Sequence, residues 1–266
     1  MDLFRLPPEI AEKLGTFPPL TCAEYEQLRT QWGNAVAGAL EGPDCPLCLN
    51  RGYVVKLDER GGQTCAECSC MGRRRSLQRI RESGLQGQLE RCTFERFETP
   101  EPWQAAMKQK ARAFLSDNRG KWFVAAGAVG SGKSHICTAI CGALLNAGLE
   151  VRFMSWRDEG GRIKAAVNDN GEYTRLIEPL KRVRVLYIDD LFKTPAGSAV
   201  TQGDVNLAFE LLNSRYMDPR LVTVISSEKT IEEMLNIDEA VGSRIYERSR
   251  DYYIRLAGQG MNWRLR

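Results

Sequence analysis

A glycine-rich segment of eight residues constrains the fold of this 266-residue chain more than any other feature. Residues 127–134, Gly-Ala-Val-Gly-Ser-Gly-Lys-Ser, match the pattern G-x-x-x-x-G-K-[ST]. An apolar run that predicts a buried strand, residues 122–126, precedes this segment, and an apolar stripe at helical spacing follows it. A strand, this loop and a helix together predict a phosphate-binding P-loop in an α/β fold.

The residues of the P-loop have distinct expected roles. Backbone N–H groups around the glycines turn toward the phosphates, Lys133 reaches the β and γ oxygens, and the Ser134 hydroxyl ligates Mg²⁺. The dipole of the following helix stabilises the same anion. We therefore expect ATP and Mg²⁺ as cofactors. The residues of this segment expected to bind the nucleotide are Gly127, Gly130, Ser131, Gly132, Lys133, Ser134 and His135.

Two acidic residues, Asp189 and Asp190, follow the apolar run 183–188. Hydrolysis in P-loop enzymes needs such a second site, in which the first carboxylate holds the Mg²⁺ shell and the second polarises the attacking water. We expect Asp189 and Asp190 in these two roles, and Lys133 and Asp190 as catalytic residues. The next candidate strand ends at Ser226-Ser227, and we expect the hydroxyl of Ser226 beside the γ-phosphate as a sensor; the alternative is a turn-forming serine.

Short apolar runs alternate with helical patterns through the second part of the chain. The runs that predict buried strands are residues 122–126, 151–156, 183–188, 221–225 and 252–256. This rhythm predicts a mostly parallel five-stranded sheet with helices on both faces. Earlier in the chain, a capping box at Thr21 predicts a helix to about Leu40. We place the domain boundary so that residues 1–91 form a helical and metal-binding module and residues 92–266 form the ATPase domain.

Five of the nine cysteines lie between Cys45 and Cys70, in close pairs. In a reducing compartment this clustering predicts metal binding rather than disulfides. Cys45 and Cys48 form the first pair, and thiolates at such spacing close a tetrahedral Zn²⁺ site. Spacing alone does not decide which cysteines form the second pair of ligands. Cys65 with Cys68 fits a zinc ribbon, and Cys70 is an alternative ligand.

The charge, hydropathy and histidine content of the chain exclude several classes of function. The 37 Lys+Arg and 34 Asp+Glu leave a net charge of only +3, so any DNA contact must come from a local cluster. Residues 1–20 lack the pattern of a targeting signal, and no stretch approaches the roughly 18 apolar residues of a membrane span, so we expect a cytoplasmic protein without membrane contact. The single histidine belongs to the P-loop segment, which argues against histidine-dependent hydrolases. The local cluster of basic residues that could contact DNA consists of Arg73, Arg74, Arg75, Arg79 and Arg81.

A second basic segment follows the second predicted core strand. It consists of Trp156, Arg157, Arg162 and Lys164. Base stacking on the aromatic ring with phosphate contacts from the cations would hold single-stranded DNA there. The alternative is a solvated helix face.

The order of these motifs resembles the DnaC/DnaI-type AAA+ replicative helicase loaders, over almost the whole chain. The resemblance rests on the P-loop, on Leu-Tyr-Ile-Asp-Asp-Leu-Phe-Lys (186–193), on Ile-Ser-Ser-Glu-Lys-Thr (225–230) and on Gly-Ser-Arg-Ile-Tyr-Glu-Arg (242–248). It implies an AAA+ core without the full C-terminal lid, preceded by a helicase-binding module. It also implies Arg244 as an arginine finger acting on a neighbouring subunit, and Cys68 with Cys70 as the second cysteine pair. The implied partners are a replicative hexameric helicase, single-stranded DNA and further copies of this chain in an ATP-dependent homo-oligomer.

Two other functions compete with the helicase loader, which would act as an ATP-hydrolysing switch in replication initiation. An IstB-type transposition-helper ATPase shares the core motifs, but that group generally lacks a cysteine module. A P-loop small-molecule kinase would need a mobile lid and an acceptor pocket, and would not need Arg244 at a subunit junction.

Overall fold

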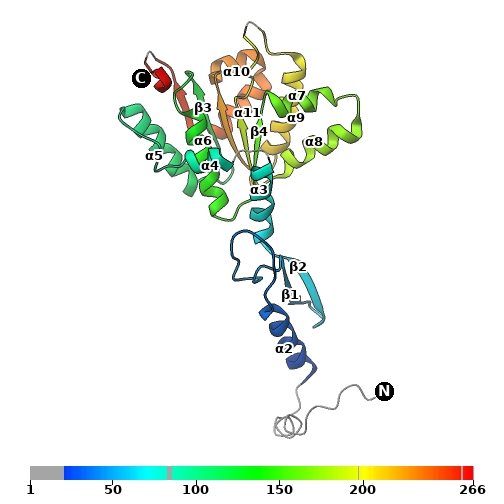
Figure 1. Cartoon of the computed structure of the whole chain (residues 1–266). Helices are drawn as coiled ribbons and strands as arrows, with labels where there is room; N and C mark the ends of the chain where they lie inside the picture. Colours follow the sequence, from blue (N-terminus) through cyan, green and yellow to red (C-terminus); the bar gives the residue numbers. More distant parts are fainter. Residues whose placement is uncertain (1–20, 83–85, 197, 259, 266) are drawn as a thin grey trace. The chain divides into compact units, whose positions relative to one another are not determined.

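The computed structural model describes residues 21–82, 86–196, 198–258 and 260–265, and the chain divides into two compact units, Met1–Met71 and Gly72–Arg266 (Figure 1). Residues 1–20, where the sequence predicts no targeting signal, lie outside the described part, as do the side chains of Arg79 and Arg81. No helix in the described part is long and apolar enough to cross a membrane.

The first unit contains a helix and a β-hairpin. Helix α2 (Cys22–Ala35) begins at the predicted capping box, in which Thr21 and Glu24 each accept a hydrogen bond from the backbone N–H of the other. Strands β1 (Tyr53–Leu57) and β2 (Gln63–Glu67) pair in antiparallel register. The carbonyl and amide of Val55 in β1 bond the side chain of Asn34, which fixes α2 against the hairpin.

Helix α2 is shorter than the sequence predicts. It ends at Ala35 rather than near Leu40, because the following residue adopts extended backbone. The N–H of Gly38 donates to the carbonyl of Leu49, and the N–H of Leu40 donates to the carbonyl of Asn50. These long-range bonds with the cysteine loop replace the last helical turn.

The second unit is built on a five-stranded sheet of parallel neighbours in the order β4-β5-β6-β3-β7. The predicted parallel five-stranded sheet is therefore confirmed. The strands are β3 (Trp122–Gly127), β4 (Val151–Ser155), β5 (Val185–Asp189), β6 (Val222–Ser227) and β7 (Tyr253–Leu256). Each lies within two residues of its predicted range at either end, because strands buried on both faces read as continuous apolar runs.

Helices cover both faces of the sheet (Figure 1). Phe123 and Val124 are neighbours on β3, yet they belong to the cores on opposite faces. One face is covered by α3 (Cys70–Glu82), α4 (Gln86–Arg91), α5 (Pro102–Ser116) and α6 (Lys133–Asn146). The other is covered by α7 (Asp158–Ala165), α8 (Asn170–Arg182), α9 (Gln202–Tyr216), α10 (Ile231–Ile237) and α11 (Glu239–Ser249).

The compact unit that holds the sheet begins before the sequence-based boundary at residue 92. Ile80 of α3 and Leu89 of α4 pack into the core that α6 shares with the sheet. The division of function between residues 1–91 and 92–266 stays a prediction.

Candidate functional site

The P-loop lies between β3 and α6, pressed against the end of β7. Gly127 has φ +115°, and a Cβ on it would lie 2.2 Å from the carbonyl oxygen of Leu256. The N–H of Ala128 donates to that same oxygen at 2.8 Å. A residue without a side chain is therefore required where the loop leaves the strand.

Lys133 is buried inside this loop, with 6% of its surface exposed. Its Nζ donates to the carbonyl oxygens of Gly127 at 2.9 Å and Ala128 at 2.6 Å. Burial lowers the pKa of the ammonium, while Glu228 and Asp190 act in the opposite direction. An ammonium has three N–H donors, so one remains for a phosphate oxygen.

A pocket of about 510 Å³ opens at the loop, a volume typical of small-molecule sites. Its walls come from the P-loop, from the segment before α5, from the residues after β5 and β6, and from the C-terminal segment. The residues that line it include Gln88, Cys92, Arg96, Phe97, Glu98, Gln104, Gly130, Lys133, Ser134, His135, Asp190, Lys193, Glu228, Trp263 and Arg264.

Asp189 connects the P-loop helix to the sheet. The Ser134 hydroxyl donates to its Oδ1 at 3.0 Å, which brings the two expected Mg²⁺ ligands into contact. The hydroxyls of Tyr187 and Ser226 each donate to the same oxygen at 2.5 Å. The three hydroxyl donors fix the Asp189 carboxylate in position. Carboxylate oxygens are the ligands that a hard cation such as Mg²⁺ prefers.

Ser226, expected as a γ-phosphate sensor, is fully buried. Besides donating to Asp189, its hydroxyl accepts the backbone N–H of Asp190 at 2.9 Å. It is not among the residues that line the described pocket. The structure thus places this hydroxyl where it bonds the carboxylate of Asp189 and the backbone of Asp190; sensing stays a prediction.

Asp190 faces the pocket from a left-handed backbone conformation, φ +59°. Its carboxylate pairs with Lys193 at 2.7 Å, and Lys193 pairs with Glu228 at 2.9 Å. Hydrogen bonds to these two carboxylates raise the pKa of Lys193. A non-glycine residue at positive φ is uncommon, and such strain concentrates at functional sites.

His135 and Arg244 occupy different places. The His135 ring lies edge-on to Phe97 in the pocket wall, with Nε2 2.9 Å from the Thr93 carbonyl oxygen. Arg244 lies on α11, where its Nε donates to Asn213 Oδ1 at 3.0 Å and its guanidinium stacks on Phe209 at 5.1 Å. Arg244 does not line the described pocket of its own chain.

The expected base stacking on Trp156 is wrong. This side chain is only 2% exposed, and its ring packs edge-on against Phe192 at 5.6 Å. Lys164 is paired with Asp204 at 2.5 Å. Sequence reasoning misread the last residue of the apolar run, which continues into the core beyond the end of β4.

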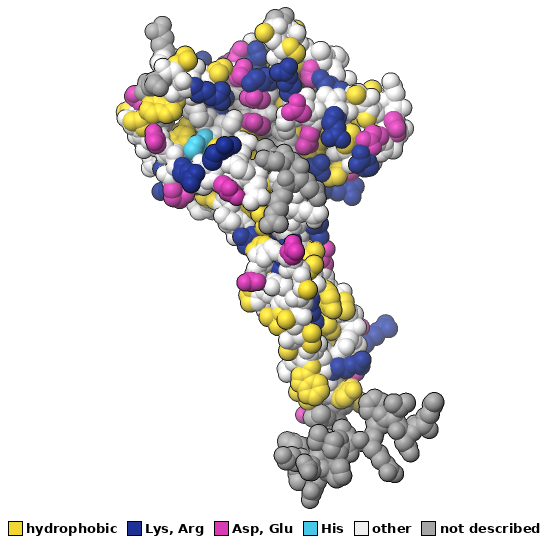
Figure 2. All heavy atoms as spheres, in the orientation of Figure 1, with side chains coloured by type: hydrophobic (Ala, Val, Ile, Leu, Met, Phe, Trp, Pro, Cys, Tyr) yellow, Lys and Arg dark blue, Asp and Glu magenta, His cyan; other side chains and the backbone are white. Residues whose placement is uncertain are grey.

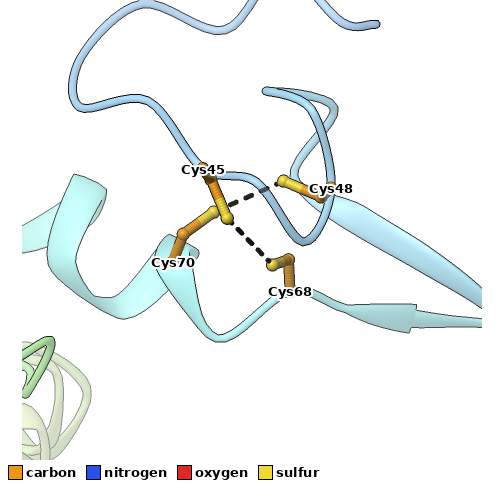
Figure 3. A group of neighbouring side chains, drawn as sticks. All are labelled: Cys45, Cys48, Cys68 and Cys70. Atoms are coloured by element: carbon orange, nitrogen blue, oxygen red, sulfur yellow. Dashed lines mark hydrogen bonds between the residues drawn. The ribbon is translucent and has the colours of Figure 1, made fainter. Parts of the chain in front are cut away.

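The first unit brings four cysteines together (Figure 3). Their sulfur atoms all lie within 4.8 Å of one another, with Cys45–Cys68 at 3.7 Å and Cys48–Cys70 at 3.6 Å. Tetrahedral Zn–S bonds of about 2.3 Å would separate the sulfurs by about 3.8 Å, so the arrangement fits Zn²⁺. Cys65 is exposed on β2 and does not join the cluster.

The cluster also favours thiolate over thiol. Burial raises the pKa of Cys48, but the Gly52 N–H and the neighbouring thiols outweigh it and lower the pKa to about 6. The Gly52 N–H donates to Cys48 Sγ at 3.4 Å. Thiolates are the form that binds Zn²⁺.

Sequence reasoning missed several residues of the nucleotide pocket region, among them Tyr187, Trp263 and Arg264. Tyr187 reads as an ordinary apolar strand residue, although a tyrosine two positions before a carboxylate on one strand faces the same side as it. Trp263 and Arg264 also line the pocket, although no role was assigned to either residue from the sequence.

Comparison with known proteins agrees with this geometry. The family of IstB-like ATP binding proteins matches residues 70–250. The chain belongs to this family. The uncharacterized protein YqaM of Bacillus subtilis is 29% identical over 266 residues, covering 82% of this chain and 84% of that protein. The replicative helicase loader DnaC of Escherichia coli K12 is 24% identical over 196 residues, covering 72% of this chain and 77% of that protein.

A solved structure shows the same fold. The crystal structure of DnaI superposes with a TM-score of 0.52 and 20% identity, covering 64% of this chain and 93% of that chain. The chain is therefore a member of an ATP-binding family whose core has the fold of DnaI, and its cysteine cluster lies largely before the matched residues.

Proposed function

We propose that this chain is an ATP-hydrolysing switch that loads a replicative hexameric helicase onto single-stranded DNA. The observation that carries the ATPase part is the contact between Ser134 and Asp189, with Asp190 next to it at the pocket. A P-loop serine in contact with an acidic strand end is the arrangement that holds Mg²⁺ beside a triphosphate.

Each residue has a role in this proposal. Ser134 and Asp189 hold the metal, and Lys133 binds phosphate oxygens. Asp190 accepts a proton from the attacking water, and Lys193, paired with it at 2.7 Å, holds its carboxylate in position. Bound ATP supplies the free energy of hydrolysis that makes the switch directional.

The first unit supports the loader over a transposition helper. The family match begins at residue 70, so α2 and most of the cysteine module lie outside the part shared with that family. One relative that spans 72% of the chain is named a replicative helicase loader. These two observations favour a partner-binding module of the loader kind.

An apolar face of α2 fits such a partner. Tyr25, Leu28 and Trp32 fall on one side of the helix at i, i+3 and i+7. Trp32 is 73% exposed and Tyr25 is 55% exposed. Figure 2 shows hydrophobic side chains gathered on the visible face of this unit. Exposed aromatic residues on one face are typical of protein interfaces.

The DNA contact rests on fewer residues than the sequence predicts. Basic and acidic side chains are mixed on the visible face of the second unit (Figure 2). Arg74 is buried, and Arg73 bonds the side chain of Asn146, so these members of the arginine cluster have structural roles. Arg157 and Arg162 are both exposed, and we propose that they contact the DNA backbone in an assembled oligomer.

Co-purification with a replicative helicase tests the proposal. Wild-type protein should retain the helicase, hydrolyse ATP, and place the helicase on single-stranded DNA. Trp32→Ala should release the helicase but keep ATP binding, because α2 is outside the nucleotide pocket. Tyr53→Ala, a half-exposed aromatic residue on β1 of the same unit, is the control and should retain it.

The competing functions give different results in the same experiments. If the protein does not bind a helicase but shows ATP-dependent activity toward a transposase, it is a transposition helper rather than a helicase loader. Phosphate transfer to a small acceptor faster than to water would show a kinase.

A further inference from the structure

The C-terminal segment runs along the P-loop and touches it at two places. At the end of β7, Leu256 accepts the N–H of Ala128 at 2.8 Å. Seven residues later, the N–H of Trp263 donates to the carbonyl of Gly130 at 3.0 Å. The segment therefore follows the loop from its first glycine to its middle one.

The second contact is closely packed. Gly130 has φ +72°, and a Cβ on it would lie 1.9 Å from Oδ1 of Asn262. The same Oδ1 accepts the N–H of Arg264 at 3.1 Å. Asn262 thus fixes the short helix η1 (Trp263–Leu265) against the turn of the P-loop.

This placement brings a cation to the nucleotide pocket. Trp263 and Arg264 line the pocket together with Lys133 and Lys193. Lys133 bonds loop carbonyls and Lys193 bonds two carboxylates. The guanidinium of Arg264 is exposed, and no side chain or carbonyl among the described residues pairs with it.

We infer that the C-terminal segment is part of the nucleotide site and that Arg264 binds the phosphates of the nucleotide held by its own chain. A guanidinium presents paired N–H donors that match phosphate oxygens, and such charge-assisted bonds are stronger than neutral ones. The inference rests on the proposed ATP binding and names a residue outside the known motifs. It also supplies a cation in cis, distinct from Arg244.

The contacts between the C-terminal segment and the P-loop have a second consequence. A phosphate bound by both Lys133 and Arg264 bridges the P-loop and the C-terminal segment. Bound nucleotide should therefore hold residues 257–265 against the loop more tightly, which slows the exchange of their amide hydrogens.

Nucleotide titration of the full chain tests the first consequence. Arg264→Ala should weaken ATP and ADP binding roughly 5- to 30-fold, since the lost bonds are charge-assisted but partly exposed. Arg264→Lys, which keeps the charge without the paired donors, should lose less. Leu265→Ala is the matched control, because Leu265 belongs to the same turn, is 83% exposed and does not line the pocket.

Hydrogen exchange tests the second consequence without measuring activity. Adding ADP should slow exchange of residues 257–265 in wild-type protein and in Leu265→Ala, and change it little in Arg264→Ala at a concentration that saturates that variant. Thermal unfolding checks that each variant is folded.

The outcomes separate this inference from the proposed function. If wild-type protein binds no nucleotide, the proposed function fails. If wild-type protein binds ATP and Arg264→Ala binds it equally well, with the same protection of residues 257–265, the proposed function stands and the role of Arg264 is overturned.

Discussion

The hydroxyl of Ser226 lies 2.5 Å from Oδ1 of Asp189, although the two residues belong to different strands. The same hydroxyl accepts the N–H of Asp190 at 2.9 Å. β5 and β6 are adjacent in the sheet, so their carboxyl ends meet at one edge. A single buried hydroxyl therefore bonds both the carboxylate of Asp189 and the backbone of Asp190, the two residues that the proposed hydrolysis uses.

Ser226→Ala should lower Mg²⁺-dependent ATP turnover about tenfold and raise the Mg²⁺ concentration needed for half-maximal rate. The variant removes one bond to Asp189 and leaves the buried Asp190 N–H without its acceptor, which costs about 1–3 kcal/mol. Steady-state hydrolysis over a Mg²⁺ series measures both effects.

Ser227→Ala is the matched control for this prediction. Ser227 is equally buried on the same strand, but its hydroxyl donates to the carbonyl of Leu191 at 2.6 Å rather than to Asp189. It should lose stability while keeping its Mg²⁺ dependence. Equal Mg²⁺ dependence in the two variants would contradict the positioning role of Ser226.

The fold was largely predictable because buried strands and the starts of helices have recognisable residue patterns. All five core strands read as apolar runs, and the capping box at Thr21 begins α2. The hairpin of β1 and β2 was not predicted, since its residues are mostly exposed and give no apolar alternation. Strand order also cannot be read from such runs, because it depends on which helices cover which face.

The candidate site was predictable only where a motif carries it. The P-loop and the Asp189–Asp190 pair have fixed local spacing. Tyr187 acts through a hydrogen bond of 2.5 Å to Asp189, and Arg264 reaches the pocket through the path of the chain after β7. For Trp156 the sequence predicted a binding role that the structure does not support. An aromatic residue at the end of an apolar run is as consistent with the core as with a binding surface, and Trp156 is buried.

The cysteine cluster predicts one Zn²⁺ per chain. Cys70→Ser should lose the metal, because Cys70 Sγ lies 3.6 Å from Cys48 Sγ within the cluster. Cys65→Ser, the control, should keep a full equivalent, since Cys65 is exposed on β2. Elemental analysis of the purified variants decides between them, and zinc loss from Cys65→Ser with retention in Cys70→Ser would reverse the assignment.

Zinc removal should affect the two units differently. A structural Zn²⁺ site contributes on the order of 10 kcal/mol to a small module. A chelator should therefore unfold the first unit and abolish helicase binding, while nucleotide binding by the second unit persists. Loss of nucleotide binding under the same treatment would contradict this independence.

Asp204 should stabilise the second unit in a pH-dependent way. Burial raises the pKa of Asp204, but hydrogen bonds from Lys164 and Thr201 outweigh it and lower the pKa below its usual value. A carboxyl with a lowered folded-state pKa contributes stability above its unfolded pKa of about 4 and loses that contribution as the pH falls through the folded value.

Asp204→Asn should therefore reduce the free energy of unfolding by about 1–3 kcal/mol at neutral pH, and by less below about pH 4. Denaturant unfolding at several pH values measures the difference. Glu233→Gln is the control, because it occupies the same capping-box position in α10 but is exposed, and it should change stability by less than about 1 kcal/mol. A pH-independent effect of Asp204→Asn would show that its packing, not its charge, matters.

Arg244 should act on the nucleotide of a neighbouring subunit. Its guanidinium is held on α11 by Asn213 and Phe209, and it does not line the described pocket of its own chain. Arg244→Ala should keep ATP affinity near that of wild-type protein and lower turnover at least tenfold, against about 10³- to 10⁵-fold for arginine fingers of GTPases. Arg250→Ala, at the end of the same helix, should leave turnover unchanged.

Mixing variants distinguishes action in trans from action in cis. Asp190→Ala lacks the proposed base but supplies an intact Arg244, whereas Arg244→Ala supplies an intact Asp190. A mixture should recover part of the activity, because some interfaces then combine Asp190 of one chain with Arg244 of the next. Turnover per chain should also rise with protein concentration. If the two inactive variants never complement each other with helicase and single-stranded DNA present, and wild-type turnover is independent of concentration, Arg244 does not act in trans.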